Sequence, residues 1–273
     1  MSAAAGLQCG FGEFLGADTL AAVRAAGFSV VRLDLQGQGA DGRPLPDGLP
    51  LEKTALLAQE VVDQGLQPLC IIRRAEQMTV LPDGALVEFG NEPDLAKFGW
   101  TRESYLKEAR RCVAIARETK RRLYLGVVSN LNKRGFDFLE SLPWHEWPWI
   151  EHDSQIACSV HRYPDGRDPR NPHKGCKSRE HEIAKLKAIV GPRALALTEV
   201  GYSDGPGYWS ECEVAAHMAW ERQFFSAHGF ELCVAFQLND GPPENRTTEA
   251  HFGFRRYGTG EWKPVAKAFT QAV

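Results

Sequence analysis

Short β-type runs alternate with longer amphipathic stretches along the chain of 273 residues. Strands that alternate with helices imply parallel pairing and right-handed crossover connections. Eight such runs in a chain of this length fit a closed (β/α)8 barrel, the TIM barrel, which typically needs about 250 residues. We therefore predict an α/β protein with a single (β/α)8 domain over residues 1–273.

The expected elements follow from the period of the apolar residues in each run. The predicted strands are Leu7–Phe11, Ser29–Leu35, Gln67–Ile72, Leu86–Phe89, Leu123–Ser129, Ile156–His161, Leu195–Val200 and Leu232–Leu238. The predicted helices are Asp18–Ala26, Leu51–Gln64, Arg102–Arg121, Phe136–Leu142, Ser178–Val190, Ser210–His228 and Pro264–Ala272. The segment from Arg73 to Gly84 is too short for a full helix, so we expect a short or missing helix after the third strand.

An open doubly wound sheet is the competing architecture. Its usual signature is G-x-G-x-x-G after the first strand. In this chain Gly10 and Gly12 are followed by Gly16, which is one position too late. The barrel is therefore the better prediction.

The composition narrows the class of partner. Hydrophobic residues make up 43% and charged residues 25%, with a formal net charge of −3. This charge argues against a nucleic-acid or anionic-membrane surface, and no segment approaches membrane-spanning length. The seven cysteines include no C-x-x-C pair, which argues against a disulfide framework or a zinc site. The N-terminus does not resemble a signal peptide, so cytoplasmic and, after removal of such a peptide, secreted locations both remain open. The oligomeric state is not predicted.

Alternation within the second strand indicates where a site lies. In the run VVRLDL, the apolar Val31 and Leu33 point to one face, and Arg32 and Asp34 point to the other. One face can meet the helices, and the other becomes polar toward the C-terminal end of the strand. This gradient is expected for a barrel with an active site at its C-terminal mouth.

Two predicted strands end on a carboxylate. Glu92 follows the fourth strand in LVEFGNEPD, and Glu199 ends the seventh in ALALTEVGYS. In a barrel both side chains would project into the same mouth. Two carboxylates that face one pocket are what the cleavage of a glycosidic bond requires, one as acid and one as nucleophile.

The segments GNEPD and LTEVGYS resemble the acid/base and nucleophile motifs of glycoside hydrolase clan A, a large group of retaining (β/α)8 enzymes. The resemblance covers the chain from about Leu7 to Phe269, although only short segments carry it. It implies that Glu92 is the general acid/base and Glu199 the nucleophile.

The resemblance also implies roles for four supporting residues. Asn91 matches the amide that binds the sugar 2-hydroxyl, and Arg32 matches the arginine that keeps the nucleophile ionised. His161 and Tyr163 match an H-x-Y pair on the sixth strand, in which the tyrosine hydroxyl contacts the nucleophile. A cation and a hydroxyl donor near Glu199 would lower the pKa of its carboxyl.

Further candidates come from the predicted mouth loops. Trp100 follows the fourth strand, and Trp209 and Tyr202 follow the seventh, so we expect each to line a sugar subsite. Many clan members have a tryptophan at the end of the eighth strand, where this chain reads CVAFQLNDG. Strand alternation places Gln237 on the inward side there, and we expect it to contact the substrate.

These observations predict a retaining hydrolase of β-linked glycans, with a β-glucan or related oligosaccharide as substrate. The expected chemistry uses no metal and no organic cofactor. The alternative is a carbohydrate-binding barrel without turnover. A lyase or aldolase barrel is a third reading, but it usually shows a lysine or a set of metal ligands at the strand ends, and the sequence shows neither.

Overall fold

The computed structural model describes residues 2–10, 12–39, 43–147, 155–164, 166–242, 244–245 and 247–272. Phe11, the last residue of the first predicted strand, lies outside the described residues. Among the described residues, no helix is both long and apolar enough to span a lipid bilayer.

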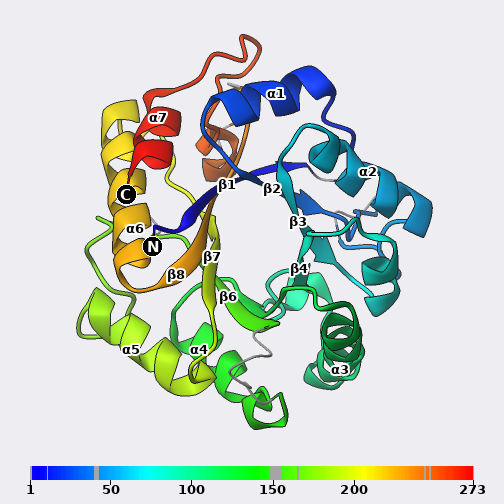
Figure 1. Ribbon diagram of the computed structural model, residues 1–273. Helices are drawn as coiled ribbons and strands as arrows, with labels where there is room; N and C mark the ends of the chain where they lie inside the picture. Colours follow the sequence, from blue (N-terminus) through cyan, green and yellow to red (C-terminus); the bar gives the residue numbers. More distant parts are fainter. Residues whose placement is uncertain are drawn as a thin grey trace.

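Eight parallel strands close into a barrel in sequence order, and the last strand pairs with the first (Figure 1). This confirms the predicted fold class. The strands are β1 (Ala4–Gly10), β2 (Val30–Asp34), β3 (Gln67–Ile72), β4 (Leu86–Phe89), β5 (Leu123–Val128), β6 (Ile156–Arg162), β7 (Leu195–Val200) and β8 (Phe230–Ala235).

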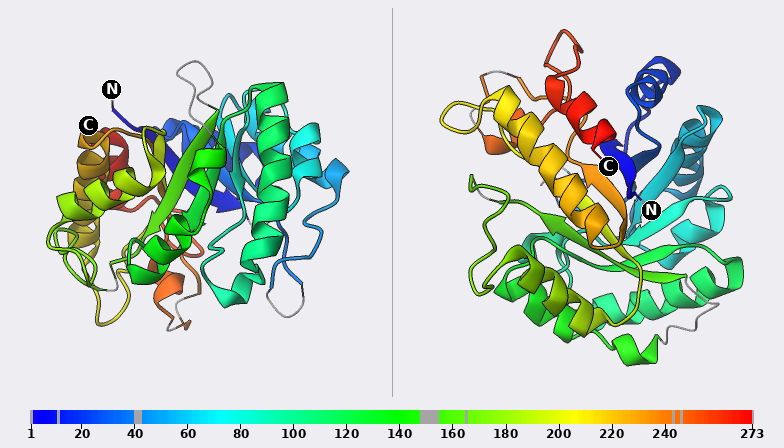
Figure 2. Two further views of the ribbon diagram at one scale, coloured as in Figure 1. Left: turned by 90° about the horizontal axis from the view of Figure 1, so that it is seen from below. Right: turned by 60° about the vertical axis from the view of Figure 1, so that its left-hand side comes forward.

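Helices surround the barrel, and α6 and α7 lie side by side near the two chain termini (Figures 1 and 2). The helices are α1 (Ala17–Ala25), α2 (Leu51–Asp63), α3 (Arg102–Thr119), α4 (Lys133–Glu140), α5 (Arg179–Val190), α6 (Glu211–Ala227) and α7 (Pro264–Gln271). The short 3-10 helix η1 (Ala75–Val80) stands between β3 and β4, where the sequence predicted no full helix. Three more 3-10 turns are η2 (Ala96–Phe98), η3 (Trp144–Glu146) and η4 (Thr248–His251).

The barrel interior changes from apolar to polar along its axis. Near the N-terminal ends of the strands, a buried cluster fills the interior with side chains that include Val30, Tyr124 and Leu232. Near the C-terminal ends, the interior holds buried charged groups such as Arg32 and Glu88. A separate, larger apolar layer joins the outer faces of the strands to the helices. The sequence pattern in β2 therefore predicted this gradient correctly.

Three element boundaries differ from the prediction by three residues, and the others agree to within two. β1 begins at Ala4 rather than Leu7, and β8 ends at Ala235 rather than Leu238. Apolar residues continue past the end of β8, and composition alone does not reveal where the chain leaves the sheet.

The third difference is the start of α4. It begins at Lys133 rather than Phe136, because Asn132 caps the helix. The Asn132 side chain accepts a hydrogen bond of 3.1 Å from the Gly135 backbone N–H. An N-cap of this kind satisfies one of the free N–H groups of the first turn and extends the helix ahead of its apolar face.

Candidate active site

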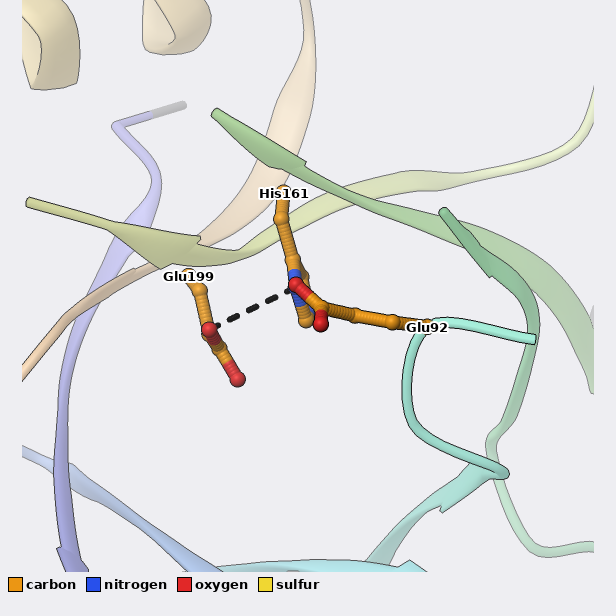
Figure 3. Close-up of side chains that lie close together, drawn as sticks. All are labelled: Glu92, His161 and Glu199. Atoms are coloured by element: carbon orange, nitrogen blue, oxygen red, sulfur yellow. Dashed lines mark hydrogen bonds and ion pairs between the residues drawn. The ribbon is translucent and has the colours of Figure 1, made fainter. Parts of the chain in front are cut away.

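Glu92 and Glu199 converge at the C-terminal mouth of the barrel, on either side of His161 (Figure 3). The two carboxylates are only 7% and 6% exposed. His161 Nδ1 lies 3.2 Å from Glu92 Oε1 and 3.4 Å from Glu199 Oε2. One atom from each of the three side chains lies within 4.8 Å of the others. The two glutamates predicted from the sequence therefore face one another in the structure.

The backbone at Glu92 adopts an unusual conformation. Its φ of 41° lies in the left-handed region, which costs a residue other than glycine roughly 1–2 kcal/mol. The Glu92 carbonyl accepts a 2.9 Å hydrogen bond from the Leu95 N–H, which closes the turn after β4. Strain of this size is typically retained where a side chain must be aimed at a functional site.

Arg32 on β2 holds several buried groups of the site together. Its Nη1 donates to Glu199 Oε1 and, at 2.9 Å, to Gln8 Oε1. Its Nη2 pairs with Glu88 Oε1 and donates to Asn91 Oδ1 at 3.0 Å. Glu88 is therefore a buried ion-pair partner of Arg32 in the barrel interior. Arg32 thus fixes the Asn91 amide next to the carboxylate of Glu199.

The pKa of Glu199 lies below its ordinary value. Burial would raise this pKa, but His161, the Arg32 guanidinium and the Tyr163 hydroxyl together outweigh burial. Tyr163 donates its hydroxyl to Glu199 Oε2. Burial and the nearby Glu199 hold the pKa of Tyr163 well above its usual value, so its hydroxyl stays protonated. The site therefore favours an ionised Glu199, which is the form a nucleophile needs.

His161 is buried and lies between charged neighbours. Burial would lower the pKa of its imidazole, but the Glu199 and Glu92 carboxylates raise it above the ordinary value. Its Nε2 lies 3.3 Å from Arg32 Nη2. The His161 ring therefore lies between the two carboxylates on one edge and the Arg32 guanidinium on the other.

A pocket of about 630 Å³ opens above these residues. Tyr163, Phe236 and Phe252 form an aromatic wall, with ring centroids about 6 Å apart from one another. Tyr208 and Trp209 line the same pocket. Phe236, Phe252 and Tyr208 are not among the residues predicted from the sequence. The aromatic residue in CVAFQLNDG was the available signal for Phe236.

The structure brings most of the predicted residues to the pocket. Asn91, Tyr163, Tyr202 and Trp209 line it, as do Arg32 and both glutamates. Tyr202 contributes only its ring, because its hydroxyl turns away and donates to Glu221 on α6 at 2.7 Å.

Three predicted residues do not line the pocket, and one of them, the buried His161, still contacts both candidate carboxylates. The Trp100 ring is covered by the Arg73 guanidinium, 3.7 Å from the ring centroid, and packs edge-on against Phe89. Gln237 was placed inward by extending the strand alternation, but β8 ends at Ala235 and the chain turns there. The neighbouring Phe236 lines the pocket instead.

Glu92, His161 and Glu199 have the donor types and spacing to hold a metal ion. Carboxylate and imidazole suit several divalent cations. However, the Arg32 guanidinium is already paired with Glu199, and its charge opposes a second cation at the same carboxylate. The arrangement is better suited to proton transfer and nucleophilic attack.

Solved structures of glycoside hydrolases are similar to this chain over nearly its whole length, whereas no family model and no curated protein matches the sequence. A family 39 glycoside hydrolase from Bacteroides cellulosilyticus WH2 has 16% identity and a TM-score of 0.68, with coverage of 98% of this chain and 63% of that chain. A glucosidase from Croceicoccus marinus has 14% identity and a TM-score of 0.66, with coverage of 97% and 64%. A family 5 xyloglucanase from Paenibacillus pabuli has 14% identity and a TM-score of 0.63, with coverage of 100% and 98%.

This chain spans less than two thirds of the length of the first two structures, but nearly all of the xyloglucanase. At these identities the likeness concerns the fold. The protein has the fold of the clan A glycoside hydrolases, as the sequence motifs suggested.

Proposed function

We propose that this protein is a retaining β-glycoside hydrolase, with Glu199 as the nucleophile and Glu92 as the general acid/base. The observation that supports this most directly is the pair of buried carboxylates, which place oxygens within 4.8 Å of each other in one pocket. Carboxyl groups of retaining glycosidases lie about 5–5.5 Å apart, whereas inverting enzymes need roughly 6.5–9.5 Å to admit a water.

The environments of the two carboxylates support different roles. Glu199 receives hydrogen bonds from Arg32 and Tyr163, which stabilise its anion. Glu92 contacts the buried His161, and Lys97 Nζ lies 3.6 Å away at the pocket edge. The better-stabilised anion is the better candidate for the group that must be ionised before the reaction.

In the first step, a Glu199 oxygen attacks the anomeric carbon while Glu92 gives its proton to the departing oxygen. The bond between the sugars breaks, and the glycone is held as an ester of Glu199. Glu92 is now a carboxylate. In the second step it removes a proton from water, whose oxygen attacks the same carbon and releases Glu199.

A β-linked glucan or a related oligosaccharide is the proposed substrate class. Among the similar structures are a xyloglucanase, a broad-specificity endoglucanase and a lichenase in complex with cellotetraose. The pocket volume of about 630 Å³ lies in the usual range for small-molecule sites, and its aromatic wall suits the flat face of a sugar ring.

The test is a product analysis on β-1,3-, β-1,4- and β-1,6-glucans, mannan and xylan, with proton NMR of the first anomer released. We expect the β anomer to form first, followed by slow mutarotation. A 2-deoxy-2-fluoro glycosyl fluoride should label one peptide, which contains Glu199, by mass spectrometry.

Other outcomes would replace this proposal. Early release of the α anomer would indicate inversion. A label on a different carboxylate would reassign the nucleophile. Measurable binding to these glycans without any product would favour the carbohydrate-binding alternative.

A further inference from the structure

Asp34 is a buried carboxylate in the pocket that the proposed reaction does not use. It ends β2 and is 9% exposed. The Gln36 backbone N–H donates to Asp34 Oδ1 at 2.9 Å, and Gln36 Nε2 lies 3.4 Å from the same oxygen. Among the described residues, none donates a hydrogen bond to Asp34 Oδ2. One oxygen is therefore occupied, and the other is left toward the pocket.

The Arg32 guanidinium only partly compensates the negative charge of Asp34. Arg32 already contacts Glu88 and Glu199, together with the Gln8 and Asn91 side chains. A buried carboxylate without a cation partner is costly. Burial accordingly raises the pKa of Asp34 to about 6, although Gln36 and Arg32 act in the opposite direction. A group this unfavourable for folding calls for a reason in ligand binding.

The position of Asp34 indicates which part of a ligand it meets. It lies two residues beyond Arg32 on the same face of β2, toward the mouth. Arg32 holds the Asn91 amide, the proposed contact of the sugar 2-hydroxyl. A sugar whose 2-hydroxyl meets Asn91 could therefore present a hydroxyl further round its ring to the part of the pocket that Asp34 lines.

We propose that Asp34 Oδ2 accepts a hydrogen bond from a glycone hydroxyl beyond the 2-position, which makes Asp34 a residue that determines sugar specificity. This inference rests on the proposed glycosidase function. Gln36 holds Asp34 Oδ1 in place, because the Gln36 side chain itself accepts a hydrogen bond of 3.4 Å from the Asn91 backbone N–H. The carboxylate therefore has a fixed orientation, with Oδ2 directed toward the pocket.

Asp34→Asn is the sharpest variant. Both Gln36 donors require an acceptor, so the asparagine oxygen stays on that side and its NH2 group faces the pocket. The substitution thus preserves shape and replaces an acceptor with a donor. The control is Asp63→Asn on α2, which removes the same charge from an exposed residue far from the pocket lining.

The substrates are 2,4-dinitrophenyl β-glucoside, or the glycoside of whichever sugar the product analysis identifies, and its 3-deoxy, 4-deoxy and 6-deoxy analogues. For the wild type, one analogue should show kcat/KM lower by about 10- to 100-fold, the range for a hydrogen bond to a charged group. On the parent sugar, kcat/KM of Asp34→Asn should be lower than that of the wild type by a similar factor. On the sensitive analogue, which lacks the hydroxyl in question, the variant and the wild type should have nearly the same kcat/KM. Asp63→Asn should resemble the wild type throughout.

A pH profile adds a readout that a structural role would not produce. Arg32 and Glu199 are the charged groups that act on Asp34. For the wild type, kcat/KM on the parent sugar should fall as pH drops through about 6, because protonated Asp34 is a weaker acceptor. This limb should be absent for Asp34→Asn and for the sensitive analogue.

The outcomes separate this inference from the proposed function. An active wild type with equal kcat/KM on all analogues would overturn the role of Asp34 and leave the glycosidase intact, even if Asp34→Asn fails to fold. So would losses in Asp34→Asn that are the same on every analogue. A wild type that hydrolyses no glycoside and takes no fluoro-sugar label would overturn both.

Discussion

Strand β6 carries two different kinds of buried charge on its two faces. His161 faces the barrel interior and contacts the candidate catalytic carboxylates, while the next residue, Arg162, faces outward toward α5 and α6. Both side chains are almost completely buried. We call the charged residues around His161 the inner cluster and those around Arg162 the outer cluster. The two clusters differ in how their buried charges are compensated.

The outer cluster is balanced and closed. Arg162 and Arg179 meet Glu182 and Glu221, so two guanidinium groups face two carboxylates. Arg179 contacts both glutamates at 2.7 Å, and Tyr202 also donates to Glu221 at 2.7 Å. A network of this kind joins α5 and α6 to the barrel wall and leaves no charge for a ligand.

The inner cluster is unbalanced and open. The carboxylates of Glu88, Glu92 and Glu199 surround one guanidinium and one imidazole, and a pocket lies above them. The only other cation near them among the described residues is the exposed Lys97, 3.6 Å from Glu92 at the pocket edge. The proposed mechanism places a proton on Glu92 before the reaction, which reduces the surplus of negative charge. The charges of the outer cluster are thus compensated within the fold, whereas those of the inner cluster lie beside a pocket and are available to a ligand.

The largest expected effect concerns the inner cluster. Glu199→Ala should lower kcat on every β-glycoside by on the order of 10⁴-fold or more, because it removes the proposed nucleophile. Azide should rescue this variant and give the α-glycosyl azide. The measurement is kcat with and without azide, together with NMR of the product.

Glu92→Ala is the matched control. A dinitrophenyl glycoside needs little protonation of its leaving group, so its first step should survive and the covalent intermediate should accumulate. Azide should then give the β-glycosyl azide. The opposite pair of azide products would reverse the two assignments.

The second effect concerns the outer cluster. Glu221→Gln removes a buried partner of Arg179, and we expect the free energy of unfolding to fall by about 3–5 kcal/mol. The kcat of the folded fraction should change by less than about threefold. Chemical denaturation and active-site titration measure the two quantities.

The control for this variant is Glu146→Gln. Glu146 pairs with Arg110 at 2.9 Å, but both side chains are about half exposed. Removing an exposed pair costs about 0–1 kcal/mol. If Glu221→Gln has a wild-type unfolding free energy but a much lower kcat, Glu221 contributes to the reaction and not to the stability of the fold.

The sequence predicted the inner cluster better than the outer one, and the reason is physical. The barrel, the strand ends and the positions of Glu92 and Glu199 depend on local periodicity, which the sequence displays directly. The outer cluster depends on which helix faces meet. Nothing in the chain near Arg162 indicates that Glu221 will lie beside it.

The errors have a related cause. Alternation predicts side-chain direction only while a strand continues. Beyond Ala235 the loop backbone decides direction, and so Phe236 lines the pocket and Gln237 does not. Trp100 follows β4 as predicted, but whether a loop tryptophan meets ligand or core depends on distant partners such as Arg73.

The third test uses two tyrosines. Tyr163 donates a hydrogen bond to Glu199 in the inner cluster, and Tyr202 donates one to Glu221 in the outer cluster. Tyr163→Phe removes a donor from Glu199, so the pKa of Glu199 should rise and the acidic limb of kcat/KM should move to higher pH. We expect kcat to fall about 10- to 100-fold, the range for a charge-assisted hydrogen bond. The unfolding free energy at neutral pH should also fall, by about 1.4 kcal/mol for each unit by which the pKa of Glu199 rises.

Tyr202→Phe should affect stability without affecting turnover. It removes a donor from Glu221 and should lower the unfolding free energy by about 1–3 kcal/mol, with kcat within about threefold of wild type. Equal effects of the two substitutions on both quantities would show that the two faces of β6 do not act separately.

The last expected effect is of opposite sign, a gain in stability from Asp34→Asn. A free aspartate titrates at about 3.9, whereas burial raises the pKa of folded Asp34 to about 6. Below pH 4 the carboxyl is protonated in both states, so its ionisation contributes nothing to unfolding. Between pH 4 and 6 the unfolded chain loses the proton first, which favours unfolding increasingly. Above pH 6 the penalty is constant, on the order of 2–3 kcal/mol.

Asp34→Asn removes this penalty, because the asparagine does not ionise in either state. Its unfolding free energy should therefore exceed that of the wild type above pH 6, by an amount that disappears as pH falls toward 4. Denaturation curves at several pH values between 4 and 8 measure this difference, with Asp63→Asn as the exposed control. A wild type that is the more stable protein at pH 8 would contradict the argument. A gain in stability together with a loss of sugar discrimination would place Asp34 in the inner cluster, where buried charge weakens the fold and is kept for the ligand.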